Sequence, residues 1–351
     1  RAEAEWASVD PYSPYFDVVA VLRGEYALRN GLEQPATAQF RTADQSALPE
    51  PWSSLIRLRL DLLRAADNPA EAQQLLAAIP GTLPDQGPDL RPWLPLASLQ
   101  IVAQARQLEG ILRAPADQQA QLLGQQLSEL GLYRLALARF ERVDPAAPGA
   151  LLAQAHAAFM RWQLEQTAAA TTQLRELATV APREPVIATL YATALVQQGA
   201  LDAADAALNP AEAAAPLDPA IPLVRADVLA ARREYTRAAS ELQRARDIAR
   251  PEARGRYALA LADFYLSRAY NLCSAGVDAA RAATNSAPDD PTAWRTLAAL
   301  YYHCRAYDTA AGAARAGLER VSYDAGLRYF LGVALQASGH PVVLAGDYNV
   351  I

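Results

Sequence analysis

Residues 291–322, PTAWRTLAALYYHCRAYDTAAGAARAGLERVS, carry the clearest structural signal in the chain. We interpret this stretch as two helices joined by a short turn. Ala298 and Ala310 fall where the two helices must approach closely, and a large side chain there would push the helix axes apart. Tyr307 stands where an aromatic ring can fill the space beside the turn. The stretch therefore predicts one helical hairpin.

The same pattern recurs every 34 residues, and a period of this length indicates a repeat architecture. Repeats start near 117, 151, 185, 219, 257, 291 and 325, with a four-residue slip at the frame of Tyr257. Position 8 of these repeats is small in all but one: Gly124, Ala158, Ala192, Ala226, Phe264, Ala298 and Gly332. Position 20 follows the same rule: Ala136, Ala170, Ala204, Ala238, Gly276, Ala310 and Leu344. The exceptions, Phe264 and Leu344, lie in the slipped repeat and at the end of the array.

The pattern resembles the tetratricopeptide repeat family. In the unit from Pro291, the family motif is matched by Trp294, Leu297, Ala298, Tyr301, Tyr307, Ala310 and Leu318. Gly131, Gly199 and Gly339 stand at the turn, where glycine commonly ends a helix. The resemblance covers residues 117–340 and implies an all-α fold, an α-solenoid wound as a right-handed superhelix of tandem helix–turn–helix repeats. Because the motif is structural, it specifies the fold far better than the function.

The two ends of the chain depart from the repeat. Residues 1–116 fit it partly, so we expect divergent N-terminal helical repeats with a Pro/Gly-rich loop at 79–95; an unrelated helical cap is the alternative. Residues 341–351, PVVLAGDYNVI, predict a strand-like tail outside the array. The tail resembles the strand end of exonuclease III-type phosphodiesterases, in which Asp347 and Asn349 would serve a metal-dependent nuclease. The rest of that fold is missing, so we expect the tail to be non-catalytic.

The composition of the chain limits the classes of partner that it is expected to bind. The 351 residues are 52% hydrophobic and 20% charged, with a formal net charge of -6, and every basic residue counted as Lys or Arg is an arginine. No basic face indicates nucleic acid, and no apolar stretch reaches the roughly 18 residues of a membrane span. The chain begins with Arg1, so a membrane tether in a removed N-terminal segment is one interpretation. We lean toward an exported or membrane-tethered protein, with a cytoplasmic one as the alternative.

The architecture favours binding over catalysis, because stacked hairpins form a curved groove that suits a peptide or a helix. In the family, helix A positions 2, 5, 9, 12 and 13 face this groove. The candidate partner-binding residues are therefore Phe159, Trp162, Thr193, Asp227, Tyr265, Arg268, Arg295, Tyr302, His303 and Tyr329. The alternative is that some of them pack against neighbouring helices. The Lys and Asn clamp that one family subclass uses for C-terminal carboxylates is absent.

Cys273 and Cys304 fall near the turn edges of adjacent hairpins. A disulfide between them is one interpretation, and two small buried apolar residues is the other. Neither these cysteines nor the three histidines have metal-ligand or catalytic spacing, so we expect no metal, no cofactor and no enzyme. The leading hypothesis is a protein-interaction scaffold or a subunit of a larger assembly, and the second is a self-assembling structural protein.

Overall fold

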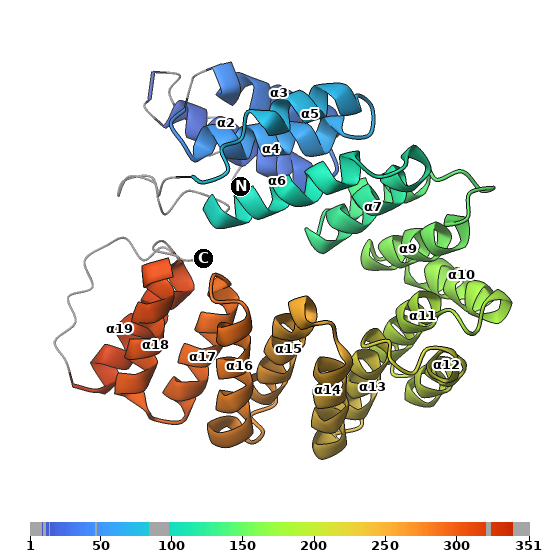
Figure 1. Cartoon of the computed structure of the whole chain (residues 1–351), viewed down its shortest axis with the longest axis vertical. Helices are drawn as coiled ribbons and strands as arrows, with labels where there is room; N and C mark the ends of the chain where they lie inside the picture. Colours follow the sequence, from blue (N-terminus) through green and yellow to red (C-terminus); the bar gives the residue numbers. More distant parts are fainter. Residues whose placement is uncertain are drawn as a thin grey trace. The chain divides into compact units, whose positions relative to one another are not determined.

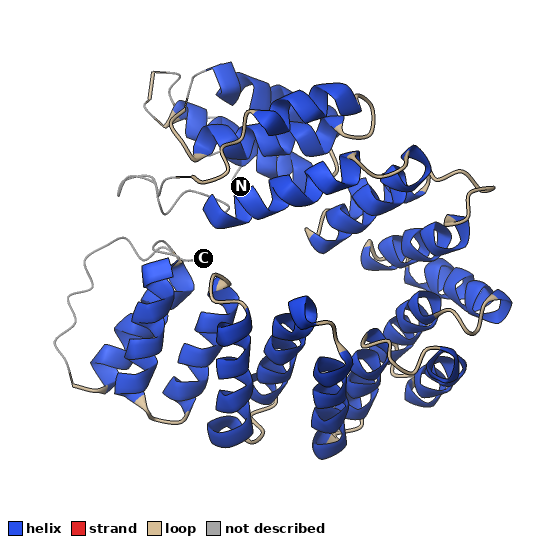
Figure 2. Ribbon diagram, viewed as in Figure 1, coloured by secondary structure: helices blue, strands red, loops and turns tan. Residues whose placement is uncertain are grey.

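The computed structural model describes residues 9, 12–13, 15–45, 48–83, 98–320 and 324–339. Within these ranges the chain is built of helices joined by short connections, and no strand occurs (Figure 2). The helices follow one another as hairpins from the blue N-terminal end to the red C-terminal end of Figure 1. The predicted all-α solenoid of tandem hairpins is confirmed.

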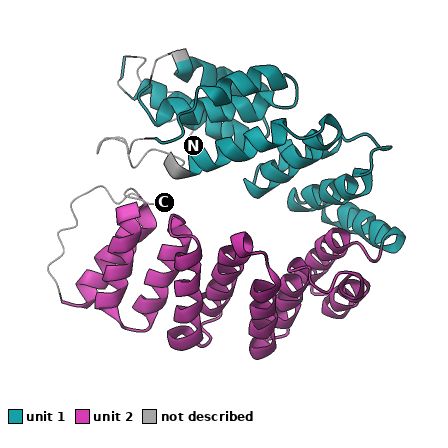
Figure 3. Ribbon diagram, in the orientation of Figure 1, with its two compact units in different colours: residues 1–181 teal, residues 182–351 magenta. Residues whose placement is uncertain are grey.

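The chain divides into two compact units, Arg1–Ala181 and Pro182–Ile351 (Figure 3). Unit 1 contains α2 (Phe16–Arg29), α3 (Glu33–Gln45), α4 (Trp52–Arg64), α5 (Pro69–Ala77), α6 (Ser98–Leu112), α7 (Ala116–Glu129), α8 (Tyr133–Phe140), α9 (Ala150–Gln163) and α10 (Thr167–Val180). Successive helices pair as hairpins except α6, which stands alone between α5 and α7.

Within unit 1 the first hairpins also pack against α8, far along the chain. Arg139 of α8 is 1% exposed and donates to the Glu33 carboxylate at 3.1 Å. Arg142 pairs with Asp67, in the turn after α4, at 2.7 Å. Gly31, in the turn between α2 and α3, lies against the aliphatic stem of Arg134. Unit 1 is therefore held together by contacts that a simple row of hairpins does not make.

Unit 2 is a regular series of hairpins. Its helices are α11 (Pro185–Gln197), α12 (Leu201–Ala214), α13 (Ala220–Ala231), α14 (Tyr235–Ile248), α15 (Arg254–Ser267), α16 (Val277–Ser286), α17 (Pro291–His303), α18 (Tyr307–Arg320) and α19 (Ala325–Ala337). A 3₁₀ turn, Pro251–Ala253, precedes α15, and a π-helical turn, Leu272–Gly276, precedes α16. We call the first helix of each hairpin helix A and the second helix B.

The small residue at position 8 packs against the residue sixteen positions later on helix B. A Cβ added to Gly124 would lie 2.7 Å from the Phe140 ring. In the divergent N-terminal part, Gly24 of α2 holds the equivalent place in a frame starting at Asp17, and a Cβ added to it would lie 2.6 Å from the Phe40 ring. Where position 8 is alanine, the residue sixteen positions later is smaller than phenylalanine. These alanine repeats pair Ala158 with Leu174, Ala192 with Leu208 and Ala226 with Leu242. The size of one side chain is thus matched to the size of the other.

The repeat expected to start at Tyr257 is corrected by the structure. Its helix A begins at Arg254, and the small residue in the close approach is Ala262, which is fully buried, rather than position 264. The four-residue slip is divided between two places. Two extra residues lie in the connection that contains the 3₁₀ turn, and two lie in the turn that contains the π-helical residues. A frame starting at Gly255 therefore restores the rule at position 8.

Several predictions fall outside the described residues. These are the tail at 341–351 with Leu344, Asp347 and Asn349, and most of the loop at 79–95. In the described ranges, every helix is too short or too polar to cross a membrane.

Candidate interaction surface

One side of unit 2 is lined by its A helices. Helix α11 packs on α13, α15 on α17, and α17 on α19, whereas the B helices pack mainly against the A helices before and after them. Elements on the inside of a curved stack approach one another more closely, so the A helices form the inner side. We call their outward positions 2, 5, 9, 12 and 13 the inner face. It includes Thr193, Leu223, Asp227, Leu259, Asp263, Arg295, Tyr302, His303 and Tyr329.

Two carboxyl groups occupy position 9 of neighbouring A helices on this face. Asp227 of α13 is in contact with solvent, yet the surrounding protein buries it enough to raise its pKa, against the opposing charge of Arg268. Asp263 of α15 accepts a hydrogen bond from the Thr296 hydroxyl at 2.8 Å. Burial raises the pKa of Asp263 despite that hydrogen bond, and nearby Asp290 raises it further while Arg295 lowers it. Neither carboxylate forms an ion pair within the described part of the chain.

Helix α17 contributes a cation and two rings. Arg295 donates to the Thr292 hydroxyl at 3.0 Å and lies 3.8 Å from the Asp324 carboxylate. The Tyr302 ring is half-buried against Tyr307, with 5.5 Å between the ring centroids, and His303 is exposed beside it. Tyr302 and His303 are thus brought together on the inner face, at the end of α17.

Tyr265 is corrected by the structure. It is 3% exposed and packs against Phe264 and Tyr270, so its ring is part of the core. In the frame from Gly255 it holds the position of Tyr301, which is also buried. The same correction moves Arg268 beyond the end of α15 into the turn, where its side chain is exposed.

The remaining predicted residues have different environments. Thr193 uses its hydroxyl to donate to the Thr189 carbonyl within α11 at 2.8 Å. Tyr329 on α19 is 56% exposed. Phe159 and Trp162 belong to unit 1, where their half-buried rings stack on each other with 5.5 Å between centroids. Of these four, Tyr329 presents the largest free apolar surface.

Cys273 and Cys304 are joined by a disulfide, with 5.5 Å between their Cα atoms. The bond connects the π-helical turn before α16 to the residue that follows α17. It therefore links two adjacent hairpins at their turns, next to Tyr302 and His303.

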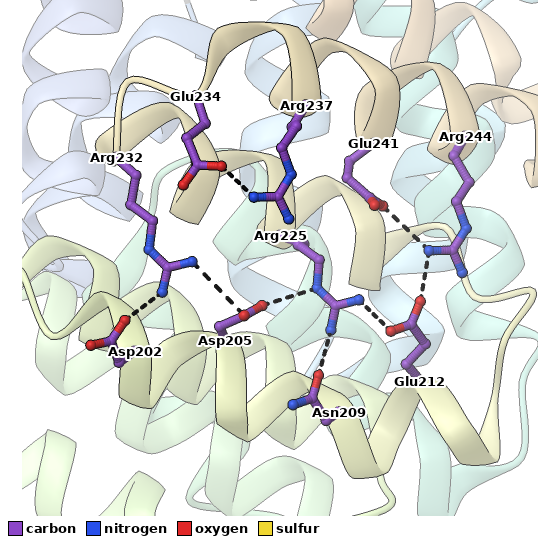
Figure 4. A network of polar contacts seen from close by, with 10 residues as sticks. All are labelled: Asp202, Asp205, Asn209, Glu212, Arg225, Arg232, Glu234, Arg237, Glu241 and Arg244. Carbon is purple, nitrogen blue, oxygen red and sulfur yellow. Dashed lines mark hydrogen bonds and ion pairs between the residues drawn. The ribbon is translucent and has the colours of Figure 1, made fainter.

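The charged residues that join α12, α13 and α14 pair with one another. Arg225 of α13 reaches α12 and contacts Asp205, Asn209 and Glu212, and Arg244 of α14 contacts the same Glu212 carboxylate at 2.6 Å (Figure 4). Burial alone would raise the pKa of Glu212, but the hydrogen bonds and charges of Arg225 and Arg244 lower it. This network joins three helices, and its role is structural.

Sequence reasoning missed Asp263, because the slipped frame assigned position 9 to the wrong residue of α15. A signal was present: Tyr265 and Tyr301 lie at the same place only in the frame from Gly255. The described residues also contain no group of three or more His, Cys, Asp or Glu side chains arranged to hold a metal ion.

No protein-family model and no curated protein sequence matches the chain. It is similar to the solved structure of TTC0263, a tetratricopeptide protein of Thermus thermophilus, with 24% identity, a TM-score of 0.39, and coverage of 63% of this chain and 100% of that one. It is similar to a tetratricopeptide repeat protein of Parabacteroides merdae, with 13% identity, a TM-score of 0.43, and coverage of 80% and 97%. A third similarity is to the human IFIT1 dimer with m7Gppp-AAAA, with 11% identity, a TM-score of 0.43, and coverage of 95% and 71%.

Proposed function

We propose that this chain is a non-catalytic scaffold that binds a protein partner, as a peptide or a helix, along the inner face of unit 2. The observation that carries the proposal is the contrast between two sets of charged residues in this unit. The charges joining α12, α13 and α14 pair with one another, whereas Asp227 is exposed on the inner face and Asp263 accepts its hydrogen bond from the neutral Thr296 hydroxyl. A partner cation at that face would compensate both carboxylates.

The rings at the end of α17 support the same proposal. Aromatic and arginine side chains are the usual anchors of protein interfaces. Tyr302, His303 and Arg295 combine such groups on one helix, within a surface that the protein's own packing leaves accessible. The partner that fits is a segment with Lys or Arg facing α13 and α15 and an apolar residue facing Tyr302.

Cross-linking mass spectrometry on native extract would identify the partner, and binding would then be measured with the purified pair. We expect Asp227→Arg to weaken binding by about 10-fold, since it replaces an attractive charge by a repulsive one. Glu319→Lys, on the exposed surface of α18, is the matched control and should leave binding unchanged. Equal binding by both variants, or turnover of a substrate by the purified chain, would contradict the proposal.

Self-assembly is the second candidate, and the exposed Tyr329 ring on α19 favours it. Size-exclusion chromatography with light scattering separates the two functions. A mass that rises with concentration and falls in Tyr329→Ser would support self-assembly, and a monomer at every concentration would exclude it.

A further inference from the structure

One turn position of the hairpins has a left-handed backbone and is occupied by glycine in some hairpins and by other residues in the rest. Position 15 of the hairpins has a left-handed backbone, with φ of +72° at Gly31 and Gly131, +75° at Gly199 and +82° at Gly339. Non-glycine residues adopt the same conformation at four other turns, namely Glu165 at 68°, Arg233 at 63°, Ala269 at 48° and Arg305 at 60°. This conformation costs a non-glycine residue roughly 1 kcal/mol or more. Two arginines therefore occupy turn positions at which glycine would make the protein more stable.

Neither arginine is used inside the protein. Arg233 and Arg305 are exposed, and neither side chain forms a hydrogen bond or an ion pair within the described part of the chain. Glu234, which follows Arg233 in sequence, pairs with Arg237. Arg268 lies in the hairpin turn between them and is exposed, and its charge lowers the pKa of Asp227. We call Arg233, Arg268 and Arg305 the basic edge; they occupy the turns of three successive hairpins.

Half-buried aromatic rings lie next to these arginines. Tyr235 and Tyr270 are packed together with 5.8 Å between centroids, and the Tyr270 hydroxyl is 2.9 Å from that of Thr236. Tyr302 and Tyr307 form a second pair beside Arg305. The combination of arginine with rigid aromatic rings is typical of interface hot spots.

The disulfide joins two of the three turns that form the basic edge. Cys304 directly precedes Arg305, and Cys273 lies in the turn that contains Arg268. The covalent link therefore restrains the two turns that carry Arg268 and Arg305 before any partner arrives. Such preorganisation lowers the entropy cost of binding.

We propose that the basic edge binds an extended acidic peptide segment with a carboxylate at about every third residue. Helices α15 and α17 pack on each other. Packed helices lie roughly 8–10 Å apart, so the turns that carry Arg268 and Arg305 are separated by about that distance. An extended chain advances roughly 3.3 Å per residue, and three residues match this spacing. Nucleic-acid binding is typically marked by a continuous basic patch or stripe, whereas the basic edge consists of three arginines on separate turns, so a peptide fits better than a nucleic acid. This surface is the turn edge, which adjoins the inner face at Tyr302 and at Asp227.

The test measures binding of a labelled peptide in which every third residue is Glu and the others are Gly or Ser. In the double variant Arg233→Gly with Arg305→Gly, we expect affinity to fall ~10-fold, because two exposed charge contacts are lost. Thermal stability should stay equal or increase, since glycine suits the left-handed turn. Loss of binding would then not be a result of unfolding. Arg250→Ala with Arg315→Ala, two exposed arginines away from the basic edge, is the charge-matched control.

Four outcomes would overturn the proposal. The glycine variant could bind the peptide as tightly as the native chain, or the control could lose as much affinity as the glycine variant. Oligouridylate could bind more tightly than the peptide, which would assign the edge to single-stranded RNA. A peptide of the same composition with its Glu residues contiguous should bind less tightly, and equal affinity would refute the spacing.

Discussion

Asp61 is a carboxyl group without a partner in the core of unit 1. Its residue is fully buried, and neither of its oxygens accepts a hydrogen bond. Burial, with a smaller contribution from the charge of Glu71, raises its pKa from 3.8 to about 8. The folded protein therefore holds a proton that the unfolded chain releases above pH 4, and the free energy of unfolding falls as pH rises from about 4 to about 8.

We expect Asp61→Asn to remove this pH dependence, because the amide stays neutral throughout. The difference in unfolding free energy between the variant and the native chain should grow with pH in that window, by up to about 1.4 kcal/mol per pH unit. Denaturant unfolding at a series of pH values measures it. Asp67→Asn, an exposed partner of Arg142, is the control and should keep the native slope. A constant difference for Asp61→Asn would show that the carboxyl is ionised in the fold.

At the scale of the helix pair, the side chain at position 8 is matched in size to the side chain sixteen positions later, and this match leads to a prediction. Gly124→Ala would place a Cβ 2.7 Å from the Phe140 ring, so we expect it to destabilise unit 1 by about 1–3 kcal/mol through overpacking. Phe140→Leu added to it should restore much of that loss, because Ala with Leu is the pair found at Ala158 and Leu174. A double-mutant cycle by chemical denaturation gives the coupling.

Gly110→Ala on α6 is the control for this cycle, since no atom lies within 4 Å of the added Cβ. It should be neutral or stabilise by up to about 1 kcal/mol, as expected for glycine replaced inside a helix. If the two changes at Gly124 and Phe140 were simply additive, the size match would have no energetic basis.

The helix pairs also show which features of the fold could be predicted from the sequence. Helix α17 begins at Pro291, the predicted repeat start, because the proline and the N-cap Asp290 mark it locally. The hairpin of α15 was misplaced because two pairs of extra residues, in the connection and in the turn, cannot be separated by spacing alone. Because of this error, Tyr265, a core residue, was predicted to line the binding surface, and Asp263 was not predicted to do so. The contact of Arg139 with Glu33 spans 106 residues, and no local pattern records it.

At the scale of the whole molecule, the chain consists of two compact units, and the disulfide lies entirely in the second. Repeat arrays are stabilised by contacts between neighbouring hairpins, so a local change need not spread along the chain. A cross-link over 31 residues restricts the unfolded ensemble of unit 2 and leaves that of unit 1 nearly unaffected.

We therefore expect Cys273→Ser with Cys304→Ser to destabilise unit 2 by about 3–4 kcal/mol without changing unit 1. Hydrogen exchange with mass spectrometry in increasing urea resolves the two units in one experiment, and peptides from unit 1 serve as the internal control. Treating the native chain with a reductant should reproduce the effect of the serine variant. If protection in both units decreased together, the chain would unfold as one cooperative body, and the division at residue 181 would have no energetic meaning.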